Sequence, residues 1–288
     1  MQAASQLDIQ ALQHQLNTRF FGIGDRLLYR PTVESTNTLA MQLGSTRLED
    51  GIVVLTDNQT AGKGRLGRRW VDISGNNVLS STLLRPLFPP YLLVFLASLA
   101  VVETISDVCA IPATIKWPND ILIGERKVAG ILIETSHSAS KNLLGVVGIG
   151  VNVNGPLQSI QAQISARSTV SSALAPTNLE TECGHEVERE RFIARLLWYL
   201  EKDYLVLQQE ASRTFSREGS VLSPAARSLQ TRWRSQLSTL GQTVQVRQGD
   251  VVISGYAEDV GEDGQLLLRR PSGELIHVTW GDIGYSAG

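Results

Sequence analysis

Residues 59–70, Gln-Thr-Ala-Gly-Lys-Gly-Arg-Leu-Gly-Arg-Arg-Trp, combine three glycines with four cations, Lys63, Arg65, Arg68 and Arg69. Glycine lets a backbone adopt positive φ and approach a ligand closely. Cations at this density repel one another unless an anion lies among them. Guanidinium groups bind carboxylates and phosphates in a bidentate way. The pattern therefore favours a ligand that carries both groups, with an ordinary solvated Gly/Arg loop as the alternative.

Three further short motifs accompany this loop. Glu-Ser-Thr-Asn at 34–37 precedes it, Lys-Trp-Pro-Asn-Asp at 116–120 follows it, and Arg-Lys-Val-Ala-Gly at 126–130 comes last. Each motif is short, but the four in this order resemble the catalytic domain of biotin protein ligases. The resemblance extends over about residues 28–154, with a weaker continuation to the C-terminus.

The resemblance implies a two-step reaction. Biotin and ATP, with Mg²⁺, give biotinyl-5′-AMP, and the biotin then passes to one lysine of the biotin carboxyl carrier protein of acetyl-CoA carboxylase. Such an enzyme must bring two anions together and stabilise charge at the α-phosphate, which requires positioned cations and N–H donors rather than a nucleophile. The four histidines are scattered along the chain, and no Ser/His/Asp set is evident. No tightly bound redox cofactor is expected.

Site residues are transferred from the family motif by motif. The biotin site is expected at Ser35, Thr36, Asn37, Gln59, Lys63, Gly64, Arg65 and Lys116, and the ATP site at Arg68, Asn119, Lys127 and Asn152. The short polar side chains should surround the ureido ring, with backbone groups at 63–64 completing that contact. Lys116 and Arg65 are the expected catalytic residues, and Asp120 is the candidate Mg²⁺ ligand.

Several of these residues also have a plainer interpretation. A hydroxyl at 35 or 36 is a typical helix cap, and Pro-Asn-Asp at 118–120 is a common turn. Trp70 and Trp117 suit either a site wall or the core. The family usually has arginine where this chain has Lys63, a change without effect if that residue acts through its backbone.

Two other functions compete with biotin ligation. A lipoate ligase of related fold would activate a different acid, and a biotin-responsive repressor would carry an N-terminal winged helix-turn-helix. About thirty residues precede the motifs, which is room for one helix but not for that domain. The formal net charge of −2 gives no general attraction to nucleic acid or anionic membranes, so neither is an expected partner. A homodimer is left open.

Composition is typical of a globular cytoplasmic protein, with 42% hydrophobic and 19% charged residues. The two cysteines, Cys109 and Cys183, are too few for a disulfide framework and are expected to be reduced thiols. No signal peptide is apparent. The most apolar run, 91–102, is too short to span a bilayer and predicts a buried helix.

Hydrophobic spacing predicts helices at 3–20, from 35 or 36 to about 43, at about 90–108 and at 187–209. Strands are predicted at 52–56, 78–84, 114–117, 121–123, 128–134 and 144–153, with turns at 21–24 and 124–125. Mostly hairpin connections indicate an α+β fold, a mixed and largely antiparallel sheet covered by helices. The resemblance implies a core like that of class II aminoacyl-tRNA synthetases.

The last fifty residues alternate like short strands, at 244–246, 251–256, 265–269 and 274–278, and predict a small SH3-like β-barrel. We therefore expect an N-terminal helix (1–25), a catalytic domain (26–236) and a C-terminal barrel (237–288). Residues 155–181 are either a plain linker or, by resemblance, a segment that folds over the adenylate. Residues 215–236 have no assignment.

Overall fold

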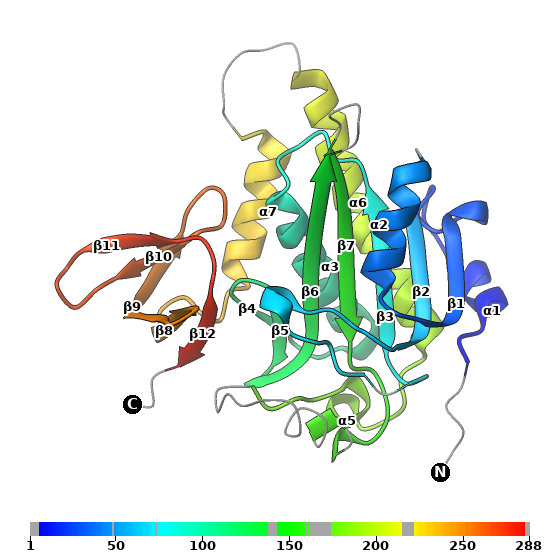
Figure 1. The fold of residues 1–288 in the computed structure, drawn as a ribbon, viewed down its shortest axis with the longest axis horizontal. Coiled ribbons are helices and arrows are strands. Elements are labelled where there is room, and N and C mark those ends of the chain that lie inside the picture. The colour runs from blue at the N-terminus through cyan, green and yellow to red at the C-terminus, as the bar shows by residue number, and fades with distance from the viewer. Residues whose placement is uncertain are drawn as a thin grey trace.

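In this computed structural model the structure describes residues 6–47, 49–72, 74–137, 143–158, 160–161, 174–214 and 222–285. A seven-stranded sheet in the order β1-β2-β3-β7-β6-β5-β4 forms its centre (Figure 1). The strands are β1 Leu27–Val33, β2 Ile52–Gln59, β3 Val78–Leu84, β4 Thr114–Lys116, β5 Asp120–Ile123, β6 Arg126–His137 and β7 Leu143–Val151. Only β1 and β2 are parallel among these pairs. The predicted mixed, largely antiparallel sheet is confirmed.

Strand β1 was not predicted. It forms an edge of the sheet and contains Pro31. Three consecutive residues of its seven are exposed. Proline is tolerated at an edge because no neighbour needs its missing N–H. An edge strand with this composition carries no alternating apolar pattern, so it could not be recognised from hydrophobic spacing.

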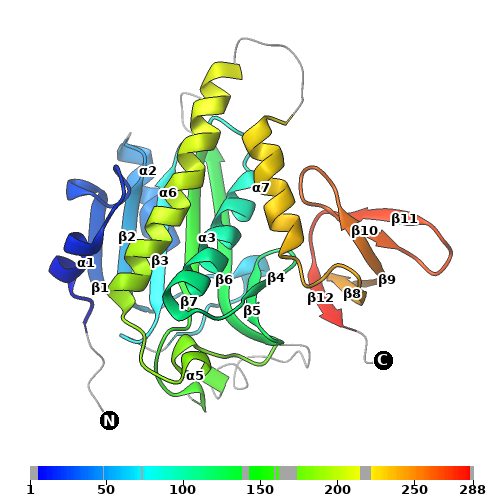
Figure 2. The same ribbon diagram turned by 180° about the vertical axis from the view of Figure 1, so that it is seen from behind.

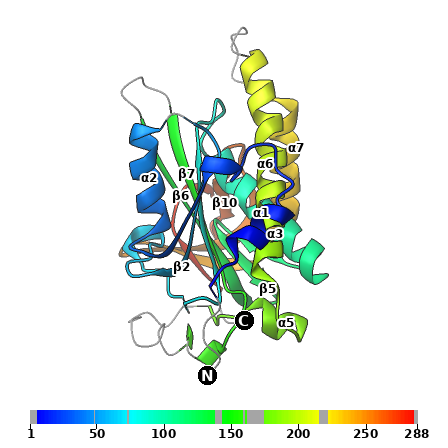
Figure 3. The ribbon, with the colours of Figure 1, turned by 90° about the vertical axis from the view of Figure 1, so that its right-hand side faces the viewer.

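The two faces of the sheet are covered unequally. Helix α2 (Thr36–Thr46) packs on β2, β3 and β7, whereas α3 (Leu92–Cys109) and α6 (Arg189–Thr214) lie on the other face (Figures 2 and 3). Helix α3 is long and apolar enough to cross a membrane, but 67% of it is buried inside the fold. The expected buried helix is therefore confirmed, and the main core lies between α3, α6 and the sheet.

The predicted helix at 3–20 is wrong in length. Helix α1 spans only Ile9–Gln15, where the Asp8 carboxylate accepts from the N–H groups of the first turn. Leu16 leaves the helix with an extended backbone and residues 19–22 form a bend and a turn, where the N–H groups of residues 19–21 donate to the Glu201 carboxylate of α6 at 2.6–2.8 Å. A buried carboxylate thus takes the bonds that a longer helix would have used.

The region 215–236, unassigned from the sequence, contains α7 (Pro224–Ser235). Ser223 caps it and Pro224 occupies its first turn, an arrangement typical of helix starts. The Trp233 ring of α7 stacks on Phe95 of α3 with centroids 4.1 Å apart. A short helix, α5 (Leu179–Cys183), precedes α6. Residues 162–173 of the predicted covering segment, and residues 215–221, lie outside the described residues.

Both cysteines are free thiols, as expected, and lie at the ends of α3 and α5. Burial, and then a hydrogen bond with Cys183, raises the pKa of the Cys109 thiol to about 12. A thiol with so high a pKa carries little thiolate at neutral pH and is a poor nucleophile.

The C-terminal residues form a five-stranded antiparallel sheet in the order β11-β10-β9-β8-β12. Its strands are β8 Thr243–Gln248, β9 Val251–Val260, β10 Leu266–Arg269, β11 Leu275–Val278 and β12 Asp282–Tyr285. Four of them match the predicted strands. The fifth, β12, was missed because four residues that include Gly284 give too short a pattern.

The segment that leads from α7 into this small sheet is hydrogen-bonded to β4, the strand that carries Lys116. The Ile115 N–H donates to the Gln236 carbonyl at 2.8 Å, and Ser238 N–H returns a bond to the Ile115 carbonyl at 2.9 Å. The Trp117 indole donates to the Gly264 carbonyl at 2.8 Å. Ile115 and Trp117 are therefore hydrogen-bonded to the segment 236–238 and to the loop between β9 and β10. The domain boundary at 236/237 stays a prediction.

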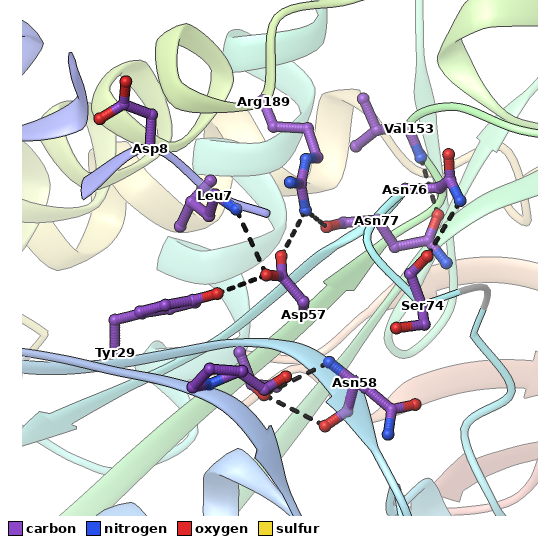
Figure 4. A network of polar contacts seen from close by, with 12 residues as sticks. Leu7, Asp8, Tyr29, Asp57, Asn58, Ser74, Asn76, Asn77, Val153 and Arg189 are labelled. Carbon is purple, nitrogen blue, oxygen red and sulfur yellow. Dashed lines mark hydrogen bonds and ion pairs between the residues drawn. The ribbon is translucent and has the colours of Figure 1, made fainter. Parts of the chain in front are cut away.

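A buried polar network fixes the end of β2 just before Gln59 (Figure 4). The Asp57 carboxylate pairs with Arg189 at 2.7 Å and accepts from the Tyr29 hydroxyl at 2.5 Å and from the Leu7 N–H at 3.3 Å. Burial, followed by the bond to Asp57, raises the pKa of Tyr29 well above its usual value. The network joins the N-terminal segment, β1, β2 and α6 at one point.

Candidate active site

The glycine-rich loop folds back on itself. The Trp70 N–H donates to the Gly62 carbonyl at 3.0 Å, and Gly64 N–H donates to the Arg68 carbonyl at 2.7 Å. At its tip Leu66 and Gly67 have φ of 54° and 73°, the left-handed region in which glycine is favoured. A cavity of about 670 Å³ is lined by residues 61–69 together with Leu132 and Glu134 of β6. This volume is in the usual range for small-molecule sites.

Trp70 anchors the loop on the sheet. Its ring lies so close to two glycines that a Cβ on Gly150 would be 2.6 Å from it, and one on Gly130 2.9 Å. Lys127 Nζ lies 5.7 Å from the ring centroid. Trp117, by contrast, is only 2% exposed and packs in the core. Of the two tryptophans left open by the sequence, Trp70 thus borders the candidate site.

A continuous chain of polar side chains joins four of the predicted residues, Thr36, Asn37, Gln59 and Lys63, at the start of α2 and beside it. The Thr36 N–H and the Gln59 Oε1 are 2.8 Å apart, and the Thr36 hydroxyl is 2.7 Å from that of Ser81. Ser81 lies 2.6 Å from Asn37 Oδ1. Beyond it, Asn37 Nδ2 reaches Glu134 at 2.8 Å, and Glu134 pairs with Lys63 at 3.3 Å.

Two members of this polar chain, Ser81 and Glu134, were missed from the sequence. Both lie in correctly predicted strands, Ser81 within the polar triplet 80–82 of β3 and Glu134 directly after the apolar run 131–133 of β6. Ser81 is fully buried, at 0% exposure. A buried polar group needs a partner, so a serine in the middle of a buried strand was the available signal.

The expected helix cap takes a different form. Ser35 is the N-cap residue of α2, but its side chain makes no capping bond. The Gln59 side chain accepts from the first helical N–H instead. Ser35, Thr36 and Asn37 are all below 5% exposure.

The candidate catalytic cations are partly buried. Lys116 is 5% exposed, and burial lowers the pKa of its ammonium; Lys127 and Arg68 act in the same direction and Asp120 opposes them. The pKa of Arg65 is also lowered, first by burial, with Asp120 opposing. Both shifts mean that burial makes the charged forms of Lys116 and Arg65 less favourable when no anion is bound.

The cations of the loop, and Lys127 beside it, have polar partners within the protein. Arg65 donates to Asn119 Oδ1 at 2.8 Å and Lys127 pairs with Asp120 at 2.6 Å. Arg68 forms an ion pair with Asp282 of β12. Arg69 donates to the Thr60 carbonyl.

Lys116 differs from these residues. Within the described ranges no carboxylate lies at ion-pair distance from its nitrogen, which lies over the Tyr285 ring, 5.2 Å from the ring centroid. A cation over a ring face is only weakly compensated compared with one beside a carboxylate.

Asn152 lies apart from the polar chain, at 4% exposure just after β7. Its Nδ2 donates to the Thr177 carbonyl at 3.0 Å, whereas its buried Oδ1 has no partner among the described residues. The buried indole N–H of Trp70 also has none there. One acceptor and one donor are therefore available to a ligand on this part of the sheet.

The described residues contain no group of three or more His, Cys, Asp or Glu side chains that could hold a metal ion. Asp120, 24% exposed at its side chain, is the one carboxylate predicted as a metal ligand. A magnesium ion bound through phosphates commonly takes only one or two protein carboxylates. The site therefore fits an ion that arrives with the nucleotide better than a resident metal.

Comparison with known proteins gives consistent matches along the chain. Residues 29–152 match the Biotin/lipoate A/B protein ligase family, and residues 239–283 match the Biotin protein ligase C terminal domain. The bifunctional ligase/repressor BirA of Bacillus subtilis is 31% identical over 255 residues, which cover 87% of this chain and 71% of that protein. The biotin–[acetyl-CoA-carboxylase] ligase of Paracoccus denitrificans is 31% identical over 249 residues, 84% of this chain and 94% of that protein.

Solved structures give the same result. Biotin protein ligase from Aquifex aeolicus, in complex with biotin and ATP, superimposes with a TM-score of 0.66 at 25% identity, over 92% of this chain and 100% of that one. The matched regions contain the glycine-rich loop, Lys116 and the C-terminal sheet. With relatives at this identity matched over most of both chains, this chain belongs to the biotin protein ligase family.

Proposed function

We propose that the protein activates biotin with ATP as biotinyl-5′-AMP and transfers it to a lysine of the biotin carboxyl carrier protein of acetyl-CoA carboxylase. The observation that carries the proposal is that the polar chain and the cations of the loop meet on one sheet. A polar chain ends at Glu134 in the cavity wall, and the loop that lines the same cavity brings Arg65 toward Asp120 and Arg68.

Lys116 and Arg65 are the proposed catalytic residues. Their pKa values are lowered by burial, so an arriving carboxylate and phosphate would supply the charge that the protein does not. Cations held in a partly dry site act strongly on charge that develops at the α-phosphate. Lys116, without an ion-pair partner among the described residues, is best suited to bridge the two reacting anions.

The nucleotide would lie at the end of the site away from the polar chain. Arg68, Asn119 and Lys127 are the proposed phosphate contacts, and the carboxylates that now hold Arg68 and Lys127 are groups that a phosphate can replace. Asn152 Oδ1 and the Trp70 N–H are available to a base. A Mg²⁺ ion accompanying ATP would take Asp120 from the protein, after Lys127 exchanges that carboxylate for phosphate.

Biotin is favoured over lipoate as the acid. The dithiolane ring of lipoate has no N–H or carbonyl to match the polar chain, whereas the ureido ring of biotin has both. The match of residues 239–283 to the C-terminal domain of biotin protein ligases supports the same choice. The absence of a nucleic-acid partner and the cytoplasmic location stay predictions. A homodimer stays open.

Pyrophosphate exchange tests the function directly. Purified protein should catalyse ATP–pyrophosphate exchange that depends on biotin and on Mg²⁺, and should then label a carrier domain but not its Lys→Arg variant. Lipoate serves as the matched alternative acid. Exchange with lipoate and none with biotin would reverse the assignment.

A further inference from the structure

The direction of each hydrogen bond in the polar chain follows from its Glu134 end. An ionised carboxylate only accepts hydrogen bonds, and so does the backbone carbonyl of Leu132. Asn37 Nδ2 lies 2.8 Å from the first and 3.3 Å from the second, so it donates to both. The amide orientation of Asn37 is thereby fixed, with Oδ1 directed to Ser81.

The next bond has only one possible direction. Asn37 Oδ1 can only accept, so the single hydroxyl hydrogen of Ser81 is used at that 2.6 Å contact. The Thr36 hydroxyl hydrogen then has two acceptors within the protein, the Ser81 oxygen at 2.7 Å and Gln59 Oε1 at 3.2 Å. Both hydroxyl hydrogens are committed inside the protein.

The other end of the polar chain is fixed by the backbone. The Thr36 N–H can only donate, so the atom of Gln59 facing it at 2.8 Å is Oε1. Gln59 Nε2 therefore keeps its hydrogens, and no described residue accepts from it. A Cβ on Gly148 would be 2.1 Å from Asn37 Oδ1, so the glycine provides the space in which this arrangement fits.

What remains for a ligand is a defined pattern. The oxygens of Thr36 and Asn37 each keep a lone pair and have no hydrogen to give, whereas Gln59 can donate. A cyclic urea presents the complement, two N–H donors and one carbonyl acceptor. Thr36 and Asn37 are only 4% and 3% exposed, and an unmatched polar group away from water is costly.

We infer that Glu134 and Ser81 are specificity-determining positioning residues for the ureido ring: they force the oxygens of Thr36 and Asn37 to act as acceptors toward its N–H groups. This inference rests on the proposed function and adds two residues to it. Neither Glu134 nor Ser81 needs to touch biotin. Glu134 fixes the orientation of the Asn37 amide, and Ser81 takes part in the hydrogen bonds that occupy the Asn37 oxygen and the Thr36 hydroxyl.

Glu134→Gln is the informative change. A glutamine can donate as well as accept, so Asn37 becomes free to rotate its amide and present N–H in place of oxygen. Glu134→Asp is the matched control, since aspartate still only accepts. Ser81→Ala removes the donor to Asn37 Oδ1 and frees the Thr36 hydroxyl to donate elsewhere.

The measurement compares biotin with a cyclic-carbamate analogue in which one ureido N–H is replaced by a ring oxygen, in pyrophosphate exchange. The wild type should prefer biotin by about a hundredfold or more in kcat/KM, because a site built to accept from N–H rejects a ligand that lacks it. In Glu134→Gln the preference should fall by about tenfold, mainly through KM, and Ser81→Ala should move it in the same direction. Glu134→Asp should keep the preference.

A purely structural role predicts a different result. Glu134→Gln would then weaken biotin and the analogue equally and leave their ratio unchanged, which would overturn the inference while an active wild type upholds the proposed function. A wild type inactive with biotin would overturn both. Thermal unfolding of each variant identifies any that fail to fold, and the ratio in the remaining variants decides.

Discussion

The side-chain nitrogen of Lys116 lies 5.2 Å from the centre of the Tyr285 ring, so a residue of the large sheet meets the last strand of the small one. Asp282 of the same strand pairs with Arg68. Strand β12 therefore contacts two of the cations assigned to the reaction. The following predictions concern these cations, the loop and the network beneath them.

Lys116→Ala should reduce adenylate formation by about a hundredfold or more while the protein remains folded, because one positioned charge at a developing oxyanion contributes roughly 3–4 kcal/mol. Biotin-dependent pyrophosphate exchange measures the loss, and thermal unfolding the fold. Since Lys116 is a buried charge, its removal should not lower the melting temperature. A variant with most of the wild-type single-turnover rate would exclude Lys116 from its assigned role.

The rate of the reaction should also fall at alkaline pH, and at a lower pH than a lysine with an ordinary pKa would give. Burial lowers the pKa of Lys116, so the ammonium deprotonates below its usual range as the pH rises. Bound anions favour the charged form of Lys116. The alkaline limb of the pH profile of kcat, where the rate falls, should therefore lie at higher pH than that of kcat/KM. Lys116→Arg should remove the limb from the profile.

The same shift has a consequence for stability. Between the lowered pKa of folded Lys116 and its ordinary value, the unfolded chain binds more protons than the folded one. Stability contributed by this group therefore rises with pH through that window. Urea unfolding at several alkaline pH values, with Lys116→Met as the pH-independent reference, measures the slope.

The loop at residues 62–69 should exchange its amide hydrogens more slowly when biotin and ATP are bound. Its exposed ion pairs, such as Arg68 with Asp282, contribute at most about 1 kcal/mol each, whereas ligand carboxylate and phosphate would bind several cations at once. Arg65→Gly should loosen the closed loop and release adenylate, which labels lysines of bystander proteins. Equal exchange in both states would indicate a preformed loop, and we would then not expect the leakage.

Arg189→Met should destabilise the fold by about 3–5 kcal/mol, because it leaves the Asp57 carboxylate buried without its partner. Tyr29→Phe removes one neutral donor to the same carboxylate and should cost only about 1–2 kcal/mol. Urea unfolding measures both. The double change Asp57→Asn with Arg189→Met should recover part of the loss, and a loss that simply adds would argue against a direct coupling.

Much of this architecture was predictable from local patterns. The strand at 78–84 was predicted with its observed bounds, and the helix near 90–108 nearly so, because segments rich in apolar and β-branched residues carry their own signal. β1 and β12 were not predictable, since both are short or polar and depend on neighbours far along the chain. Helix α1 was overestimated because Glu201, distant in sequence, takes over the N–H groups that follow it.

The site was predictable in composition but not in connectivity. Motif order identified the cations and the Ser-Thr-Asn segment, since those residues are contiguous. Glu134 and Asp282 each bind a loop cation from another strand, and no spacing rule connects them to the loop. The polar chain through Ser81 likewise depends on strand pairing, which only the folded structure brings about.

Arg68 and Asp282 are 214 residues apart in the chain, so their contact has a consequence for the order of biosynthesis. A ribosome exposes the loop and the central sheet long before it exposes β12, and domains of this size begin to fold as they emerge. A nascent chain would thus display the cationic pocket before its last strand exists. The contact between Arg68 and Asp282 would then form only after β12 has been translated, when the central sheet has already emerged.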